Sequence, residues 1–581
     1  MATPSSLPYH EPSITTIIIL SGFLILLNAI NYGLDKLVYC GLIGQVFLGI
    51  AWGTPGAGWL SEEMEHSIVQ LGYLGLILVV YEGGLSTDFR SLKANLLLST
   101  AVAITGIALP MAFSFALASM LGASPLQAFT AGAALCSTSL GTTFTVLGTS
   151  GLVTTRMGVV LTSAAMMDDV VGLIMVQVVS NLSGSAGNFE PVTVIRPVFV
   201  SLGLTVLLPL LCRFLIRPGT LHLNAARIKS PGSSLDRLLR LPQTSLTIHT
   251  GCLLGLVIVG TYAGTSGLLS AYVAGASISW WDSEVPHVPT HTAQEKQHEP
   301  PTKQTNEPKS NQATESGVLA GPPASGQRQL PDESVRNSGT EIYEHYYSKA
   351  VSIILSPFFF ASIGFSVPIS QMFSGPIVWK GVVYTLLMIL GKLICGVWLL
   401  SFVSPLRSLQ RLVRTLSRSG HEVSIVTPGA QCTQDVPRPS NEQAASGTQP
   451  TDPSHNTPER AAMAETQSTD SPTNNASPDP EMPISTYPAC ILGCAMVARG
   501  EIGFLISALA ESTGIFSGQA GAPERPSELF LIVTWAITLC TIIGPLCVGL
   551  LVNRVKRLER KSRGGKHNVL GAWGVQQSKC A

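Results

Sequence analysis

The sequence predicts an all-α polytopic membrane protein with about 13 transmembrane helices. Only 12% of the 581 residues are charged, against roughly 25% in an ordinary soluble domain, and most of these charges lie in a few stretches. Between them lie apolar runs of about 20 residues, the length that a helix needs to cross a bilayer core of about 30 Å. Helices are the expected spanning form because lipid offers no partner to backbone polar groups.

The composition excludes two other classes of protein. Lys plus Arg and Asp plus Glu both number 35, so no basic excess is present to neutralise the phosphates of a nucleic acid. The 11 cysteines are sparse for this length, and most lie inside apolar runs, unlike those of a disulfide-rich secreted protein. We therefore expect membrane lipids, and no nucleic acid, among the partners.

Thirteen apolar runs and two polar stretches organise the chain. The predicted spans are 14–30, 35–53, 66–85, 94–120, 125–149, 156–181, 192–216, 245–263, 266–281, 347–372, 376–403, 486–512 and 527–553. The corresponding regions are 1–281 with helices 1–9, 282–346 as a loop, 347–403 with helices 10–11, 404–485 as a loop, 486–553 with helices 12–13, and the tail 554–581. Both loops are rich in Pro, Ser, Thr and Gln, a composition typical of disorder.

Basic residues predict the orientation of the spans. The tail carries Arg554, Lys556, Arg557, Arg560, Lys561, Arg563 and Lys566, and the positive-inside rule assigns such a segment to the cytoplasm. With thirteen crossings the N-terminus lies outside or in a lumen, and both polar loops are cytoplasmic. The predicted outer loop before 66–85 agrees, because it holds Glu62, Glu63 and Glu65 without Lys or Arg. The pattern leaves open whether the membrane is the plasma membrane or an endomembrane.

Two adjacent carboxylates, Asp168 and Asp169, lie midway along the span 156–181. A charged residue at this depth costs about 2.5–3.5 kcal/mol on insertion scales, so it needs an explanation. Adjacent helical positions point about 100° apart, so the two side chains can line one cavity. One carboxylate could then hold either a proton or a hard monovalent cation. The alternative, a capping or packing pair, fits poorly because caps belong at helix ends.

Three further charges lie inside predicted spans. Lys392, in 376–403, could neutralise one of the two carboxylates; the alternative is a side chain that extends to the membrane interface. Arg499 and Glu501, in 486–512, lie among glycines, which predicts an interrupted helix. The alternative for them is a self-contained ion pair that stabilises packing.

Hydroxyl side chains predict a second interrupted helix. Ser137, Thr138 and Ser139 lie with glycines in 125–149, where they weaken a helix and can satisfy broken backbone bonds. The alternative is ordinary packing through small residues. Glu82, near the cytoplasmic end of 66–85, is a possible further site residue or an interfacial carboxylate.

Taken together, these motifs resemble those of the monovalent cation:proton antiporter superfamily, the sodium/hydrogen exchanger-type transporters, and most closely its second branch of cation/proton exchangers. The similar segments are 74–88, Ser137-Thr138-Ser139, Asp168-Asp169, 266–275, 357–364, Gly391-Lys392 and 499–504. Their order and spacing make the resemblance specific, and it covers nearly all spans but neither polar loop.

The resemblance implies inverted repeats in which 125–149 and 486–512 cross as two broken helices. It implies that Asp169 is the main ion and proton carrier and that Asp168 assists it and pairs with Lys392 when no cation is bound. Ser137, Thr138 and Ser139 would supply oxygen ligands, while Arg499 and Glu501 stabilise the crossing. Relatives form homodimers through peripheral helices, so we expect a homodimer here.

The expected function is secondary active exchange of Na⁺ or K⁺ for H⁺ by alternating access, with no cofactor. An intramembrane aspartyl protease needs carboxylates on separate facing helices, so we expect no enzyme. A channel is disfavoured because no pore-loop filter is apparent. A proton- or sodium-coupled symporter of an organic solute on a related fold remains the alternative.

Overall fold

The computed structural model describes residues 11–38, 40–139, 152, 155–183, 191–230, 233–239, 241–285, 338–401, 486–518, 525–561, 570 and 573–574. The secondary-structure elements in these ranges are helices, and ten stretches of them are long and apolar enough to cross a membrane. The predicted class, an all-helical membrane protein, is confirmed. The predicted loop 404–485 lies outside the described residues.

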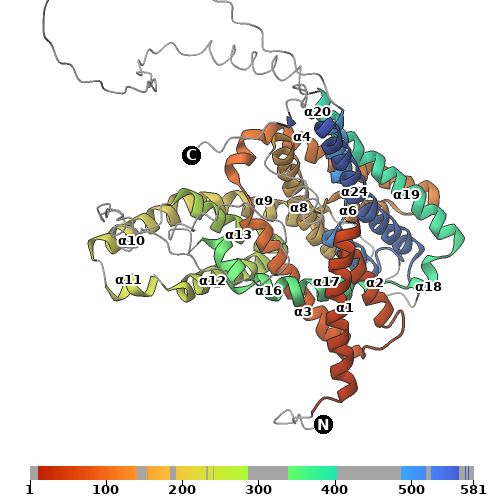
Figure 1. Cartoon of the computed structure of the whole chain (residues 1–581), viewed down its shortest axis with the longest axis horizontal. Helices are drawn as coiled ribbons and strands as arrows, with labels where there is room; N and C mark the ends of the chain where they lie inside the picture. The colour runs from red at the N-terminus through yellow and green to blue at the C-terminus, as the bar shows by residue number, and fades with distance from the viewer. Residues whose placement is uncertain are drawn as a thin grey trace, which may run out of the picture. The chain divides into compact units, whose positions relative to one another are not determined.

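The helices of the first half of the chain are coloured from red to green in Figure 1. They are α1 (Ile14–Val38), α2 (Leu42–Trp52), α3 (Glu62–Leu85), α4 (Phe89–Ser114), α5 (Ala116–Leu121), α6 (Pro125–Cys136), α8 (Arg156–Ser183), α9 (Pro191–Leu211), the π-helical segment η1 (Cys212–Ile216), α10 (Arg217–Lys229), α11 (Ser234–Leu239), α12 (Pro242–Ala263) and α13 (Gly267–Glu284).

The helices of the second half follow the first polar loop. They are α15 (Gly339–Tyr346), α16 (Ser348–Ala350), the π-helical segment η3 (Val351–Leu355), α17 (Ser356–Phe365), α18 (Ile369–Met372), α19 (Gly375–Leu393), the 3₁₀ segment η4 (Ile394–Gly396), α20 (Val397–Ser401), α22 (Tyr487–Val497), α23 (Glu501–Ser512) and α24 (Glu528–Lys561).

Each of the thirteen predicted segments contains a helix, but three of these helices are not among the ten long spans. The segment 35–53 contains α2, which is 11 residues long, 125–149 contains α6, and 266–281 contains α13. Residues 140–149 lie outside the described part of the chain. The number thirteen therefore stays a prediction for these three.

Several predicted boundaries differ from the structure. The segment 35–53 is not one helix, because α1 continues to Val38 and the Gly41 backbone N–H donates to Asp35 Oδ1 at 2.6 Å before α2 begins. The predicted loop 282–346 ends earlier than expected, because α15 is helical and its Gly339 N–H donates to Asp282 Oδ2 at 2.7 Å. The predicted span 527–553 also ends too soon, since α24 continues to Lys561.

Close backbone contacts hold α3 against α13. A Cβ atom at Gly275 would lie 2.2 Å from the carbonyl oxygen of Tyr81, and one at Gly84 would lie 2.2 Å from that of Tyr272. Only glycine fits at such positions, as is common where membrane helices approach closely. This contact fixes Tyr272 beside the end of α3.

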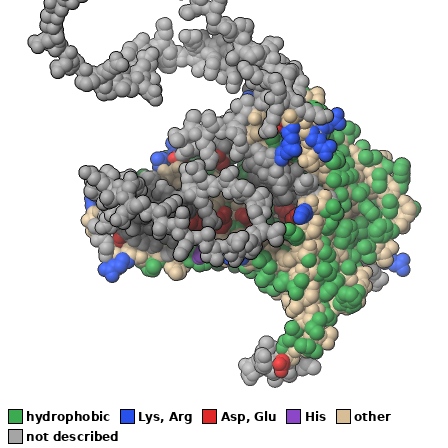
Figure 2. Space-filling model, in the orientation of Figure 1, with side chains coloured by type: hydrophobic (Ala, Val, Ile, Leu, Met, Phe, Trp, Pro, Cys, Tyr) green, Lys and Arg blue, Asp and Glu red, His purple; other side chains and the backbone are tan. Residues whose placement is uncertain are grey.

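A second group of helices surrounds α8. The helix pairs in contact include α4 with α8, α6 with α23, α8 with α23, α19 with α24 and α22 with α24. Figure 2 shows hydrophobic side chains gathered over α19 and α24, with Lys and Arg side chains at the C-terminal end of α24. This surface suits a lipid environment bordered by a charged layer.

Candidate functional site

Helix α8 carries the two adjacent carboxylates midway along its 28 residues. Asp168 is fully buried and Asp169 is 8% exposed. Because neighbouring helical positions differ by about 100°, the two side chains enter different surroundings. The structure therefore separates two carboxylates that are identical in the sequence.

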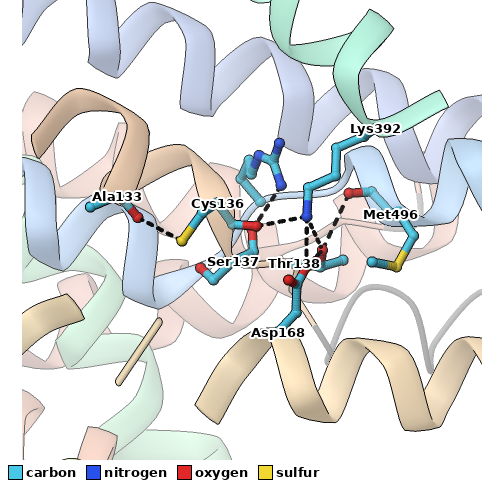
Figure 3. Close-up of polar contacts among 8 residues, drawn as sticks. Ala133, Cys136, Ser137, Thr138, Asp168, Lys392 and Met496 are labelled. Atoms are coloured by element: carbon cyan, nitrogen blue, oxygen red, sulfur yellow. Dashed lines mark hydrogen bonds and ion pairs between the residues drawn. The ribbon is translucent and has the colours of Figure 1, made fainter. Parts of the chain in front are cut away.

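Asp168 lies in a buried ion pair with Lys392 of α19 (Figure 3). Lys392 Nζ is 2.6 Å from Asp168 Oδ2, and both side chains are completely inaccessible to solvent. The Thr138 hydroxyl lies 2.6 Å from the same Asp168 oxygen and donates to it. A buried charge needs such a partner, because leaving it unpaired is very costly.

The ammonium group of Lys392 also binds the end of α6. It donates to the Cys136 carbonyl oxygen at 2.6 Å and to Thr138 Oγ1 at 3.0 Å. Helix α6 ends at Cys136, and the last carbonyls of a helix have no partner within the helix. A cation is favoured there by the helix dipole, so Lys392 stabilises the interruption as well as Asp168.

A second interruption separates α22 from α23. Helix α22 ends at Val497 and α23 begins at Glu501. Arg499, which lies between them, is fully buried and donates from Nη1 to the Ser137 carbonyl oxygen at 2.8 Å. The arginine between α22 and α23 thus satisfies a backbone carbonyl just beyond the end of α6.

The two interruptions also bond directly through their main chains. The Ser139 N–H donates to the Ala498 carbonyl oxygen at 3.0 Å. The Thr541 hydroxyl of α24 lies 3.0 Å from the Arg499 carbonyl oxygen and 2.6 Å from the Ile537 carbonyl oxygen within its own helix. Backbone polar groups at the end of α6 and between α22 and α23 are therefore satisfied where these two segments meet.

Asp169 lies in a different environment from Asp168. Within the described ranges we find no hydrogen bond to its carboxylate, and the neighbouring charge that acts on it most is Glu501, ahead of Asp168 and Lys392. Glu501 is partly buried at the first position of α23. Asp169 and Glu501, which lie on different helices, therefore interact electrostatically.

The structure joins most of the predicted site residues and leaves one apart. Contacts at the interruptions link six of them: Ser137, Thr138, Ser139, Asp168, Lys392 and Arg499. Asp169 and Glu501 adjoin this cluster. Glu82 does not, because it is exposed on α3 and its neighbours are Tyr343 and Glu344 near α15.

The alternative reading of Arg499 and Glu501 as a self-contained ion pair does not fit the geometry. In the described part of the chain Arg499 donates to Ser137 and forms no ion pair with Glu501. The carbonyl oxygens of Cys136 and Met496, the latter 3.3 Å from Thr138 Oγ1, were missed by sequence reasoning, since a carbonyl leaves no side-chain signal. Thr541 was missed because it lies in an apolar run.

Comparison with known proteins shows similarity to sodium/hydrogen exchangers and antiporters. Residues 22–296 match the family described as "Sodium/hydrogen exchanger, transmembrane". The chain is 31% identical over 144 residues to the Na⁺/H⁺-K⁺ antiporter GerN of Bacillus cereus, which covers 25% of the chain and 37% of GerN. It is 29% identical over 143 residues to the high-affinity Na⁺/H⁺ antiporter NhaS3 of Synechocystis, covering 24% and 31%.

A plant relative and a solved structure extend the comparison. The cation/H⁺ antiporter 17 of Arabidopsis thaliana is 30% identical over 217 residues, 35% of the chain and 24% of that protein. The matches thus span well under two thirds of the length of these relatives. The sodium proton antiporter MjNhaP1 from Methanocaldococcus jannaschii shares the fold, with a TM-score of 0.50 and 11% identity over 93% of this chain and 99% of that one.

Proposed function

Because the chain belongs to the sodium/hydrogen exchanger family, which it matches over residues 22–296, we propose that it exchanges a monovalent cation, Na⁺ or K⁺, for H⁺ by alternating access. One observation carries this proposal: Lys392 pairs with Asp168, whereas no hydrogen bond from the described residues reaches Asp169. A carboxylate in that position is available to bind either a proton or a cation.

Asp169 is the proposed carrier. Hard cations prefer oxygen ligands, and the carboxylates of Asp168 and Glu501 are near enough to Asp169 to act on it electrostatically. Ser137 and Ser139 contribute to the same cluster. A proton and a cation cannot occupy the carboxylate together, so release of one permits binding of the other. This competition couples the two fluxes.

Lys392 and Arg499 are proposed to compensate charge. With no cation bound, Lys392 neutralises Asp168 at 2.6 Å. A bound cation would take over part of this neutralisation, which weakens the pair. Arg499 keeps the two interruptions together through Ser137, so that the ligand oxygens hold their arrangement during the cycle.

We also propose the finer architecture: thirteen spans, inverted repeats, and crossing interrupted helices built from α6 and from α22 with α23. The main-chain bond between Ser139 and Ala498 supports the crossing. The C-terminus is proposed to be cytoplasmic and the N-terminus outside or luminal. A homodimer through peripheral helices is also proposed.

Dissipation of a pH gradient in proteoliposomes tests the function. We expect Na⁺ or K⁺ to dissipate it, with Li⁺ as a third cation, and we expect Asp169→Asn to abolish the flux. Glu528→Gln is the matched control, because this carboxylate is about half exposed and pairs with Lys380 outside the cluster. Wild-type flux in the Asp169→Asn variant, or a requirement for an organic solute, would contradict the proposal.

A further inference from the structure

A cavity of about 190 Å³ lies beside the ion-carrying helix α8. Met166 and Val170 of α8 form part of its wall, and Tyr272 of α13 forms another part. Asp169 is three positions from Met166 and one from Val170, so it lies on or next to the helix face that borders the cavity. The cavity therefore ends close to the proposed carrier.

Tyr272 is held at this place by a defined hydrogen bond. Its hydroxyl lies 3.1 Å from Thr87 Oγ1, and Thr87 Oγ1 is 3.3 Å from the Gly83 carbonyl oxygen. A carbonyl only accepts, so both contacts are used when Thr87 donates to Gly83 and Tyr272 donates to Thr87. The lone pairs of the phenol oxygen then remain to accept from another group.

The hydroxyl groups of Thr205 and Ser277 in the wall also have their protons engaged. Thr205 donates to the Ser201 carbonyl oxygen at 2.8 Å, and Ser277 donates to the Val273 carbonyl oxygen at 2.7 Å. Both protons are thus used within their own helices, and what these side chains offer the cavity is oxygen lone pairs. The remainder of the wall is mostly apolar. The hydroxyl groups of this wall therefore offer oxygen ligands to a cation.

Among the hydroxyl groups of this wall, that of Tyr272 interacts electrostatically with Asp169. The charge of Asp169 acts on the phenol group, and Tyr272 is only 8% exposed. A cation that moves between the cavity and Asp169 loses water in apolar surroundings, so an oxygen at this point lowers the cost of dehydration.

We propose that Tyr272 is a cation-selecting residue of the exchanger, whose phenol oxygen, oriented by Thr87, replaces a water ligand of the monovalent cation between the cavity and Asp169. The inference rests on the proposed function, since it names a ligand on the route to the same carrier. Thr87 is a positioning residue, because it acts through Tyr272.

The test compares Tyr272→Phe with wild type in the same proteoliposomes, by measuring KM and Vmax for Na⁺ and for K⁺. One oxygen contact is worth about 0.5–1.5 kcal/mol, so we expect KM to rise about two- to tenfold for the preferred cation. The ratio of the two KM values should change, while Vmax stays within about twofold of wild type. Thr87→Val should shift the same ratio less, and Thr87→Ser should restore it.

Tyr384→Phe is the matched control. Tyr384 is fully buried and its hydroxyl lies 2.7 Å from Ser114 Oγ, but it is not part of the cavity wall. It should lose a similar hydrogen bond without any change in the KM ratio. An equal change in Tyr384→Phe would overturn the inference, because the effect would then reflect general packing.

Two failures can be told apart. If wild-type vesicles exchange cations and folded Tyr272→Phe keeps the wild-type KM values and ratio, the role of Tyr272 is refuted and the exchange function stands. If wild-type vesicles show no cation-driven proton flux, the proposed function itself fails. Should Tyr272→Phe not fold, Thr87→Val decides the question, since it leaves the ring in place.

Discussion

The segments Val194–Lys229 and Tyr487–Ser512 are both long and apolar, yet they have opposite surroundings. The first has the higher mean hydropathy, 2.2 against 1.7, but only 17% of its most apolar window is buried, against 78% for the second. Lipid tails are as apolar as leucine side chains, so nothing drives the most apolar helix inward. In this pair the more apolar segment is the more exposed one, and the less apolar segment is the more buried one.

Small and polar residues mark the buried helices instead. A Cβ atom at Gly503 of α23 would lie 2.7 Å from the Ala134 carbonyl oxygen, and one at Gly500 would lie 2.7 Å from Ser139 Oγ. A Cβ atom at Gly203 of α9 would meet nothing within 4 Å. The buried segment thus differs from the exposed one in how closely backbones approach and in how its polar groups are paired. Each of these two properties can be tested separately.

The largest expected effect comes from the buried ion pair. Lys392→Met leaves Asp168 charged and unpaired in the interior, which should cost about 3–5 kcal/mol. Lys380 lies on the same helix as Lys392, α19, and its ion pair with Glu528 of α24 is equally short, 2.6 Å. Lys380→Met breaks this pair at a partly exposed position, where the cost is about 0–1 kcal/mol. Thermal unfolding of both variants in nanodiscs measures the difference. Similar losses of stability in the two variants would contradict the exclusion of solvent from the Asp168–Lys392 pair.

The double variant Lys392→Met with Asp168→Leu sharpens this result. Replacing a whole buried pair by apolar side chains often restores stability, so the double variant should unfold at a higher temperature than Lys392→Met alone. Its transport should nevertheless be impaired, because the pair is proposed to act in the cycle. A double variant less stable than both single variants would argue against simple charge burial.

Steric contact at the helix interruption gives the next effect. A Cβ atom at Gly172 of α8 would lie 2.8 Å from Ser137 Cβ and 3.1 Å from a methyl group of Ile502. Gly172→Ala should therefore cost about 1–3 kcal/mol through overpacking. In α12, Gly251→Ala faces open space and should be neutral or stabilising, because alanine favours a helix. Melting temperatures of the two variants make the comparison.

A single hydroxyl gives a smaller effect. Thr541→Val removes the contact with the Arg499 carbonyl oxygen at nearly constant volume, and the loss of one such bond should cost about 1 kcal/mol. Thr247 of α12 donates to the Gln243 carbonyl oxygen at an exposed position, so Thr247→Val is the control and should change stability little. An unchanged melting temperature for Thr541→Val would show that the contact with the Arg499 carbonyl oxygen contributes little to stability.

The lipid-facing helix should give the smallest effect. Phe199 of α9 is 67% exposed, and surface changes of this kind usually stay within about 0.5 kcal/mol. Phe199→Ala should therefore melt like wild type, whereas Phe504→Ala in α23, where the ring is 3% exposed, should lose about 3–5 kcal/mol. A large loss for Phe199→Ala would contradict a lipid-facing position and indicate a protein contact on this face.

The sequence predicted the helical class and most of the polar cluster because charges and hydroxyls at bilayer depth are rare enough to stand out. Asp168, Lys392, Thr138 and Arg499 were all singled out in this way. The proximity of Glu501 to Asp169 was not predictable from the sequence. Arg499 is only two positions from Glu501, whereas Asp169 is over three hundred positions away. The carbonyl oxygen of Cys136 is a ligand only because α6 ends there, which composition does not reveal. Helix α15 was not predicted because it lies in a stretch of polar composition.

The bond from Ser139 N to Ala498 O has a consequence for mutational scanning. Both atoms belong to the main chain, so an alanine scan leaves this connection intact and would report the junction as tolerant. Only removal of the amide proton, by proline at 139 or by an ester in place of that amide, reaches it. A contact that joins the two segments of the proposed site can thus be essential and yet give no signal in side-chain data.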